Sequence, residues 1–143
     1  MDSLSVGVAI TGLLGSAETV RRKINAFLET KVDTGSLAED VLLEVSTIGA
    51  SLPRLRDVLQ DDRNSFAREN VFLDQLSTLL TGCVKLFSEL ESLLGGLPTV
   101  TAAGSAKIDV KLWARNEKSL RATIERIQPY RVSLFMMLQA LEL

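Results

Sequence analysis

Fifteen consecutive residues near the start of the chain, Ser3 to Ala17 (SLSVGVAITGLLGSA), carry no charged side chain, and this stretch limits the possible folds more than any other. As a helix it would reach about 22 Å, which is short of the roughly 30 Å of a bilayer core. A secretory signal needs positive charge before its apolar core, whereas the only early charged side chain here is Asp2. The small residues Gly15-Ser16-Ala17 resemble a cleavage site, so a signal peptide stays open as an alternative, but a first helix is favoured.

Four segments carry apolar residues at alternating spacings of four and three, which predicts four amphipathic helices. The first runs from Asp2 or Ser3 to about Leu28, with the stripe Val6, Ile10, Leu13, Ala17, Val20, Ile24 and Phe27. The second has Val41, Val45, Ile48, Leu52, Leu55 and Leu59, and the third, ending near Leu94, has Leu73, Leu76, Leu80, Cys83, Phe87 and Leu90. The fourth, from about Ala106 to Leu141, has Val110, Trp113, Glu117, Leu120, Ile124, Ile127, Arg131, Leu134, Leu138 and Leu141.

The connections are marked by turn and breaker residues. Ser36-Leu-Ala-Glu39 predicts a capping box before the second helix. The polar stretch 60–69 predicts a loop or a frayed helix end, and 99–106 is the most linker-like segment. Pro53 and Pro129 lie inside helical patterns and predict a kink or short break. We therefore expect one domain over residues 1–143: an all-α, antiparallel up-down four-helix bundle whose second and fourth helices are kinked or broken near these prolines.

Side chains suited to catalysis are scarce in this sequence. There is no histidine, which is the commonest general base and metal ligand, and the single cysteine, Cys83, falls on an apolar stripe. A net charge of −2 and 5% aromatic residues do not favour nucleic acid as a partner. We expect a non-enzymatic protein with no cofactor, no metal and no small-molecule substrate. One cysteine also indicates a reducing compartment, and the expected location is the cytoplasm.

Several polar or glycine positions on the predicted helices need an explanation. Gly7, Gly12 and Gly15 each cost about 1 kcal/mol relative to alanine in a helix interior, so they indicate either close helix approach or a helix that can switch. The basic residues Arg21, Arg22 and Lys23 form either a solvated helix face or a clamp at a membrane surface. Glu117 and Arg131 occupy stripe positions, either at the bundle edge or as a polar core pair, whereas Trp113 is expected to be a core anchor.

Two stretches resemble a known group of domains. The start, Met1 to Gly15 (MDSLSVGVAITGLLG), is similar to the opening of fungal HeLo-like N-terminal domains of STAND/NLR-type and ankyrin-repeat proteins, with Ser3 where the family usually has proline. Residues 111–120 (KLWARNEKSL) resemble the family's late signature through Trp113, Glu117 and Lys118, and Cys83 in a Leu-rich third helix also fits. Together with the helix that follows to Leu134, the resemblance covers nearly the whole chain.

The resemblance implies a helical effector or signalling domain that acts in regulated cell death by oligomerisation and membrane targeting. That role would fall on the apolar segment formed by Leu4, Val6, Gly7, Val8, Ile10, Gly12, Leu13, Leu14 and Gly15. Its partners would be a second copy or another helical signalling domain, and membrane lipid on activation. The alternative is a protein–protein interaction or self-association module without membrane activity, in which the first helix is buried at the centre because it is apolar on all sides.

Overall fold

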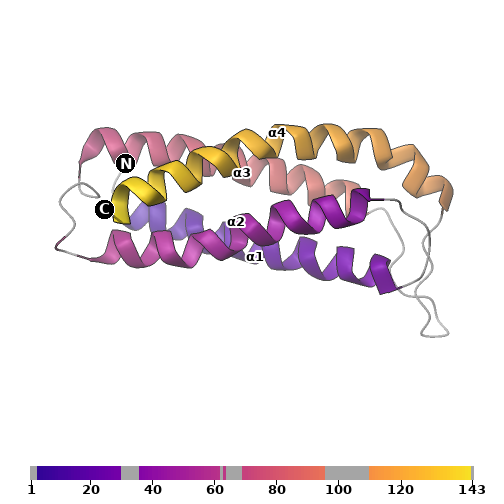
Figure 1. Ribbon diagram of the computed structural model, residues 1–143, viewed down its shortest axis with the longest axis horizontal. Helices are drawn as coiled ribbons and strands as arrows, with labels where there is room; N and C mark the ends of the chain where they lie inside the picture. The colour runs from indigo at the N-terminus through magenta and orange to yellow at the C-terminus, as the bar shows by residue number, and fades with distance from the viewer. Residues whose placement is uncertain (1–2, 30–35, 62, 64–68, 96–109, 143) are drawn as a thin grey trace.

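Four long helices form the structure, and their positions match the four apolar stripes. The computed structural model describes residues 3–29, 36–61, 63, 69–95 and 110–142. The helices are α1 (Ser3–Glu29), α2 (Leu37–Gln60), α3 (Asn70–Gly95) and α4 (Val110–Glu142), and they lie along one another in a single bundle (Figure 1). The predicted all-α up-down four-helix bundle is confirmed.

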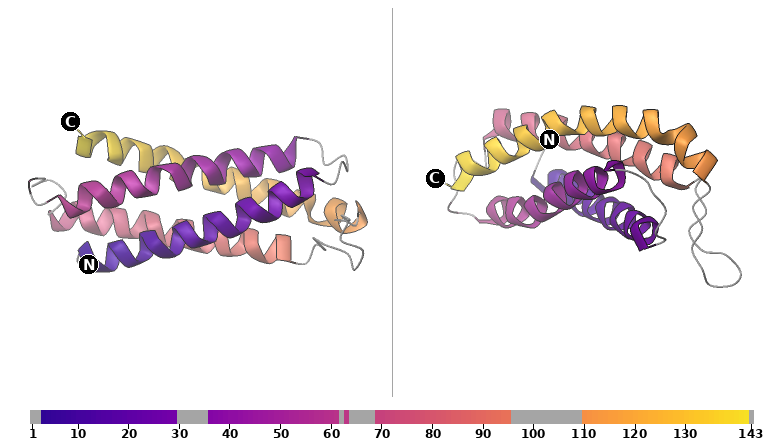
Figure 2. Two further views of the ribbon diagram at one scale, coloured as in Figure 1. Left: turned by 90° about the horizontal axis from the view of Figure 1, so that it is seen from below. Right: turned by 45° about the vertical axis from the view of Figure 1, so that its right-hand side comes forward.

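Each helix contacts two neighbours, so that the order around the bundle is α1, α2, α4, α3 (Figures 1 and 2). The pair α1 and α2 and the pair α3 and α4 are antiparallel hairpins. Between the hairpins the neighbours are parallel: Glu44 of α2 lies beside Arg131 of α4, and further along both helices Arg54 lies beside Glu142. The chain therefore crosses a diagonal of the bundle between α2 and α3.

The core lies along the inner faces of all four helices. The inner stripe of α1 is completely covered, with Val6, Ile10, Leu13, Val20 and Ile24 at 0% exposure. The stripes of the other helices meet it from the remaining sides of the bundle: Val41, Val45, Ile48, Leu52, Leu55 and Leu59; Leu73, Leu76, Leu80, Cys83, Phe87, Leu90 and Leu94; Leu120, Ile124, Ile127, Leu134, Leu138 and Leu141. Burying apolar area at about 25 cal/mol per Å² makes this contact the main source of stability.

Some local details differ from the sequence-based expectations. Both α2 and α4 continue through Pro53 and Pro129 without a break, although α4 is curved (Figure 1). No capping box forms at Ser36, because its backbone is already helical (φ −81°, ψ −7°) and its hydroxyl makes no capping hydrogen bond. The described part of the fourth helix begins at Val110, and the predicted linker at 99–106 lies outside the described residues.

A glycine allows the closest contact between α3 and α4. A β-carbon at Gly82 would overlap the ring of Tyr130, at Cε1, Cζ and the hydroxyl oxygen. Tyr130 is half-buried and packs against the core. The ring therefore occupies the space that any larger residue at position 82 would need. Glycine has a low helix propensity, but only glycine allows this contact.

We expect Gly82→Ala to lower the free energy of unfolding by about 1–2 kcal/mol, because the clash with Tyr130 outweighs the roughly 1 kcal/mol gained in helix propensity. In a Tyr130→Ala background the same change should be stabilising. Gly15→Ala is the matched control, since a β-carbon at Gly15 would meet no atom within 4 Å, and it should stabilise by about 1 kcal/mol. Urea denaturation of the four variants measures the coupling, and equal effects of Gly82→Ala in both backgrounds would contradict it.

Candidate functional site

The first helix has two opposite faces with different characters. Its inner face is the buried stripe, and its outer face, defined here as Val8, Thr11, Gly12, Gly15 and Thr19, repeats with similar helical spacing on the other side. Val8 is 67% exposed, and Thr11, Gly12 and Gly15 are exposed as well. Five positions over three helical turns therefore present no charge to solvent.

The threonines of the outer face use their hydroxyls inside the helix. Thr11 Oγ1 donates to the carbonyl oxygen of Gly7 at 3.1 Å, and Thr19 Oγ1 donates to that of Gly15 at 3.1 Å. Their hydroxyl donors are thus already satisfied within the helix. A surface of this kind can be covered at a low desolvation cost, because few polar groups lose water without a replacement.

The glycines of α1 do not mediate close packing within the bundle. A β-carbon at Gly7, Gly12 or Gly15 would meet no atom within 4 Å, so the expectation of close approach at these positions is wrong for the isolated chain. The close approach between α1 and α2 lies instead at Ala17, whose β-carbon would be 3.6 Å from one built on Gly49. The glycines leave a shallow, small-residue surface that faces away from the core.

The position of α1 also contradicts a centrally buried first helix. It contacts α2 and α3 and leaves its outer face free, as does a corner helix of any four-helix bundle (Figure 2). Leu14 is half-buried against the core and lines a groove of about 190 Å³ between α1 and α2, with Ala17, Val45 and Gly49. The side chain of Leu4 lies outside the described residues.

The three residues of the basic cluster after the apolar segment have different surroundings. Arg21 Nε donates to Glu18 Oε2 at 2.9 Å, and this hydrogen bond lowers the pKa of the Glu18 carboxyl and raises the pKa of Arg21. Arg22 is exposed and continues the line of the outer face, whereas Lys23 is half-buried. Arg22 makes no ion pair within 4 Å in the described part of the chain, although its charge also helps to lower the pKa of Glu18.

The other predicted residues are dispersed. Cys83 is fully buried, and burial raises the pKa of its thiol to about 12, which fits a structural thiol. Glu117 lies at the bundle edge and pairs with Arg121 at 3.2 Å, and Lys118 is exposed. The side chain of Trp113 lies outside the described residues.

Of the two alternatives for Glu117 and Arg131, the edge position holds for Glu117, and a core pair between these two residues is wrong. Arg131 Nε lies 2.7 Å from Oε2 of Glu44, so α4 is tied to α2, and the Glu44 side chain is only 7% exposed. Glu117 and Arg131 lie fourteen residues apart on one helix, about 21 Å along its axis, and cannot meet. A second row of α2 at the same spacing (Leu37, Val41, Glu44, Ile48) contains Glu44, and this row was the signal that could have identified it.

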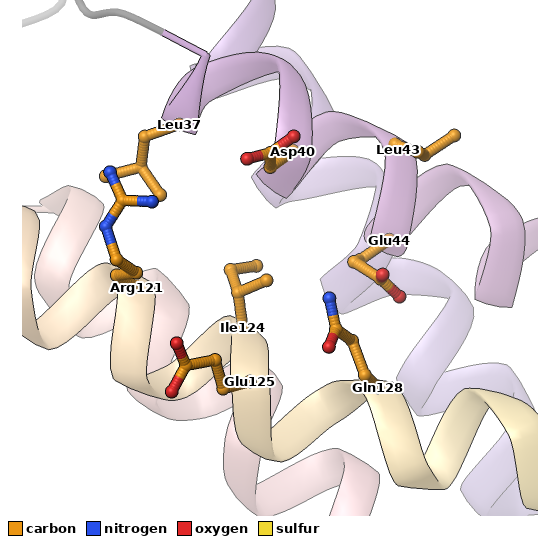
Figure 3. A pocket seen from close by; sticks show the side chains of 8 residues that line it. All are labelled: Leu37, Asp40, Leu43, Glu44, Arg121, Ile124, Glu125 and Gln128. Carbon is orange, nitrogen blue, oxygen red and sulfur yellow. The ribbon is translucent and has the colours of Figure 1, made fainter.

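A groove of about 310 Å³ lies between α2 and α4 beside this ion pair (Figure 3). Eight side chains line it: Leu37, Asp40, Leu43, Glu44, Arg121, Ile124, Glu125 and Gln128. Its base is apolar, and its rim carries two carboxylates, Asp40 and Glu125, together with Arg121, Gln128 and Leu43. Within the described ranges, no cluster of Cys, Asp or Glu is arranged to hold a metal ion.

The described helices include none that combines the length and the apolar composition needed to cross a membrane. Comparisons with protein-family models, with curated proteins and with solved structures gave no match. The resemblance to HeLo-like domains therefore stays a prediction.

We expect Arg131→Met to lower the free energy of unfolding by about 3–5 kcal/mol, because it leaves the Glu44 carboxylate buried without its partner. The double variant Glu44→Leu, Arg131→Met should recover most of the loss. Arg54→Met is the matched control, because its ion pair with Glu142 is more exposed and should be worth no more than about 1 kcal/mol. Equal losses for Arg131→Met and Arg54→Met in chemical denaturation would contradict this assignment.

Proposed function

We propose that this protein is a non-enzymatic helical interaction module of the cytoplasm, and that the outer face of α1 is its docking surface. The observation that carries the proposal is the exposed, uncharged row Val8, Thr11, Gly12 and Gly15, whose threonine hydroxyl is already bonded within the helix. The resemblance to fungal HeLo-like domains agrees with this role, since it implies a signalling domain of an NLR-like system that works by oligomerisation.

The composition of the outer face fits a partner helix better than a lipid surface. Helices that lie in a membrane interface present bulky Trp, Phe and Leu side chains. Here the described outer face offers one large apolar side chain, Val8, and otherwise glycine and threonine. Small residues allow the backbone of a second helix to approach closely, so a large area can be buried without long side chains.

A membrane-targeting effector is the second candidate, and one observation favours it. The inner and outer faces of α1 are both uncharged from Ser3 to Ala17, so a released segment would be apolar on all sides. Release would expose the buried side chains of Val6, Ile10 and Leu13, each worth about 1.5–3 kcal/mol. The total of roughly 5–9 kcal/mol is comparable to the whole stability of a typical domain, so oligomerisation or a partner would have to drive it.

We expect the purified protein to self-associate, and Gly15→Glu to weaken that association at least about tenfold, because the carboxylate would be desolvated in the contact. The new side chain has open space around it, so the fold should be retained. Thr81→Glu, at an exposed position of α3, is the matched control with the same added charge. Sedimentation velocity over a range of concentrations measures the effect, and identical behaviour of the two variants would contradict the docking surface.

A disulfide between Ala17→Cys and Gly49→Cys separates the two candidates. A β-carbon at position 49 would lie 3.6 Å from that of Ala17, and this separation is within the roughly 3.5–4.5 Å of native disulfides. The oxidised variant should still self-associate, because its outer face is unchanged. If the wild type releases the contents of anionic liposomes, and the oxidised variant does so only after reduction, the membrane candidate replaces our first proposal. Ala17→Cys alone controls for the cysteine.

A further inference from the structure

We propose that the groove between α2 and α4 receives the end of the outer face of α1 from a second copy, with Arg22 as the entering side chain. This inference rests on the proposed function and names the partner of that surface. It predicts a head-to-tail contact, in which one copy supplies the helix and the next copy supplies the groove.

Two carboxylates of the groove are left without a neutralising partner among the described residues. Glu44 is neutralised by Arg131, and Arg121 is paired with Glu117. The carboxylates of Asp40 and Glu125 remain, and neither has an ion-pair partner in the described part of the chain. Asp40 lies in the first turn of α2, where it also complements the helix dipole. Glu125 lies in the middle of α4 and has no such role.

The groove has an apolar base and an exposed leucine at its rim. Leu37 and Ile124 are buried at its base, whereas Leu43 stands at its rim with 65% exposure (Figure 3). Apolar side chains below acidic groups suit an arginine, because its aliphatic stem can pack while its guanidinium reaches the carboxylates. The exposed Leu43 needs a shallow surface opposite it, and glycine or threonine on a facing helix would provide one.

The end of α1 has the complementary features at a matching spacing. Arg22 is exposed, Lys23 adjoins it, and Arg22 follows Thr19 by three residues. Leu43 likewise follows Asp40 by three residues, so both intervals are about 4.5 Å along their helix axes. With Arg22 between Asp40 and Glu125, the rim leucine of the groove would therefore lie over the small residues of the outer face.

The two surfaces cannot meet within one copy. In the order around the bundle α1 is diagonal to α4 (Figure 2). The outer face of α1 and the groove between α2 and α4 therefore point in different directions. Each copy thus keeps one donor and one acceptor surface free. Contacts of this heterologous kind repeat from copy to copy and build rings or open chains.

Two charge-reversed proteins test the proposal. The helix variant carries Arg22→Glu and Lys23→Glu, and the groove variant carries Asp40→Lys and Glu125→Lys. Each alone should associate at least about tenfold more weakly than the wild type in sedimentation velocity. Mixed in equal amounts they should associate again, because the intact groove of the first can receive the intact helix of the second, and the reversed helix and the reversed groove also carry opposite charges. Higher salt should weaken the wild-type association, since exposed charges are screened.

The outcomes distinguish this inference from the proposed function. If Gly15→Glu abolishes association but both charge-reversed variants associate normally, the docking surface stands and the groove is not its partner. If the two variants fail to restore association when mixed, although circular dichroism shows both folded, the head-to-tail contact is wrong. A wild type that stays monomeric at low salt also overturns it. Lys85→Glu, which reverses one exposed charge on α3, should leave association unchanged.

Discussion

Every part of this structure depends on the burial of one apolar stripe from each helix. Alternating spacings of four and three keep those residues on one side of an α-helix. Four such helices can cover each other's stripes only by surrounding a common core, and each then keeps one side outside. For α2, α3 and α4 charged residues occupy much of that outer side, as the exposed ion pairs show. In α1 the outer side is uncharged over several turns, and this contrast singles it out as a surface.

The sequence was sufficient to predict the number of helices, their approximate ends and the inner faces. It was insufficient where the outcome depends on which helices become neighbours. The four stripes are alike, so they do not determine that α2 and α4 run parallel, and the partner of Arg131 followed from that arrangement. The predicted break at each proline does not occur, because packing along a whole helix can offset one lost hydrogen bond. The sequence showed that α1 has uncharged residues beyond its inner stripe. It did not decide whether those residues are exposed to solvent or buried at the centre of the bundle.

The pair Glu44–Arg131 illustrates how one polar contact can select among similar packings. Apolar stripes tolerate a shift of one helical turn, since leucine meets leucine in either register. A buried carboxylate tolerates no such shift, because it needs its counterion at hydrogen-bond distance. The pair therefore favours one alignment of the two hairpins, and it lies next to the groove between α2 and α4. A change of register would alter the groove and break the pair together.

The open glycines of α1 have a consequence for the helix–coil equilibrium of this segment. Isolated helices are marginal in water even with good helix formers, because nucleation is unfavourable. A segment with glycine at positions 7, 12 and 15 is even less stable as an isolated helix. Its helical state thus depends on packing against α2 and α3, which cover its inner stripe. Outside the bundle the segment would be a coil until another surface ordered it, so binding and helix formation would be a single event.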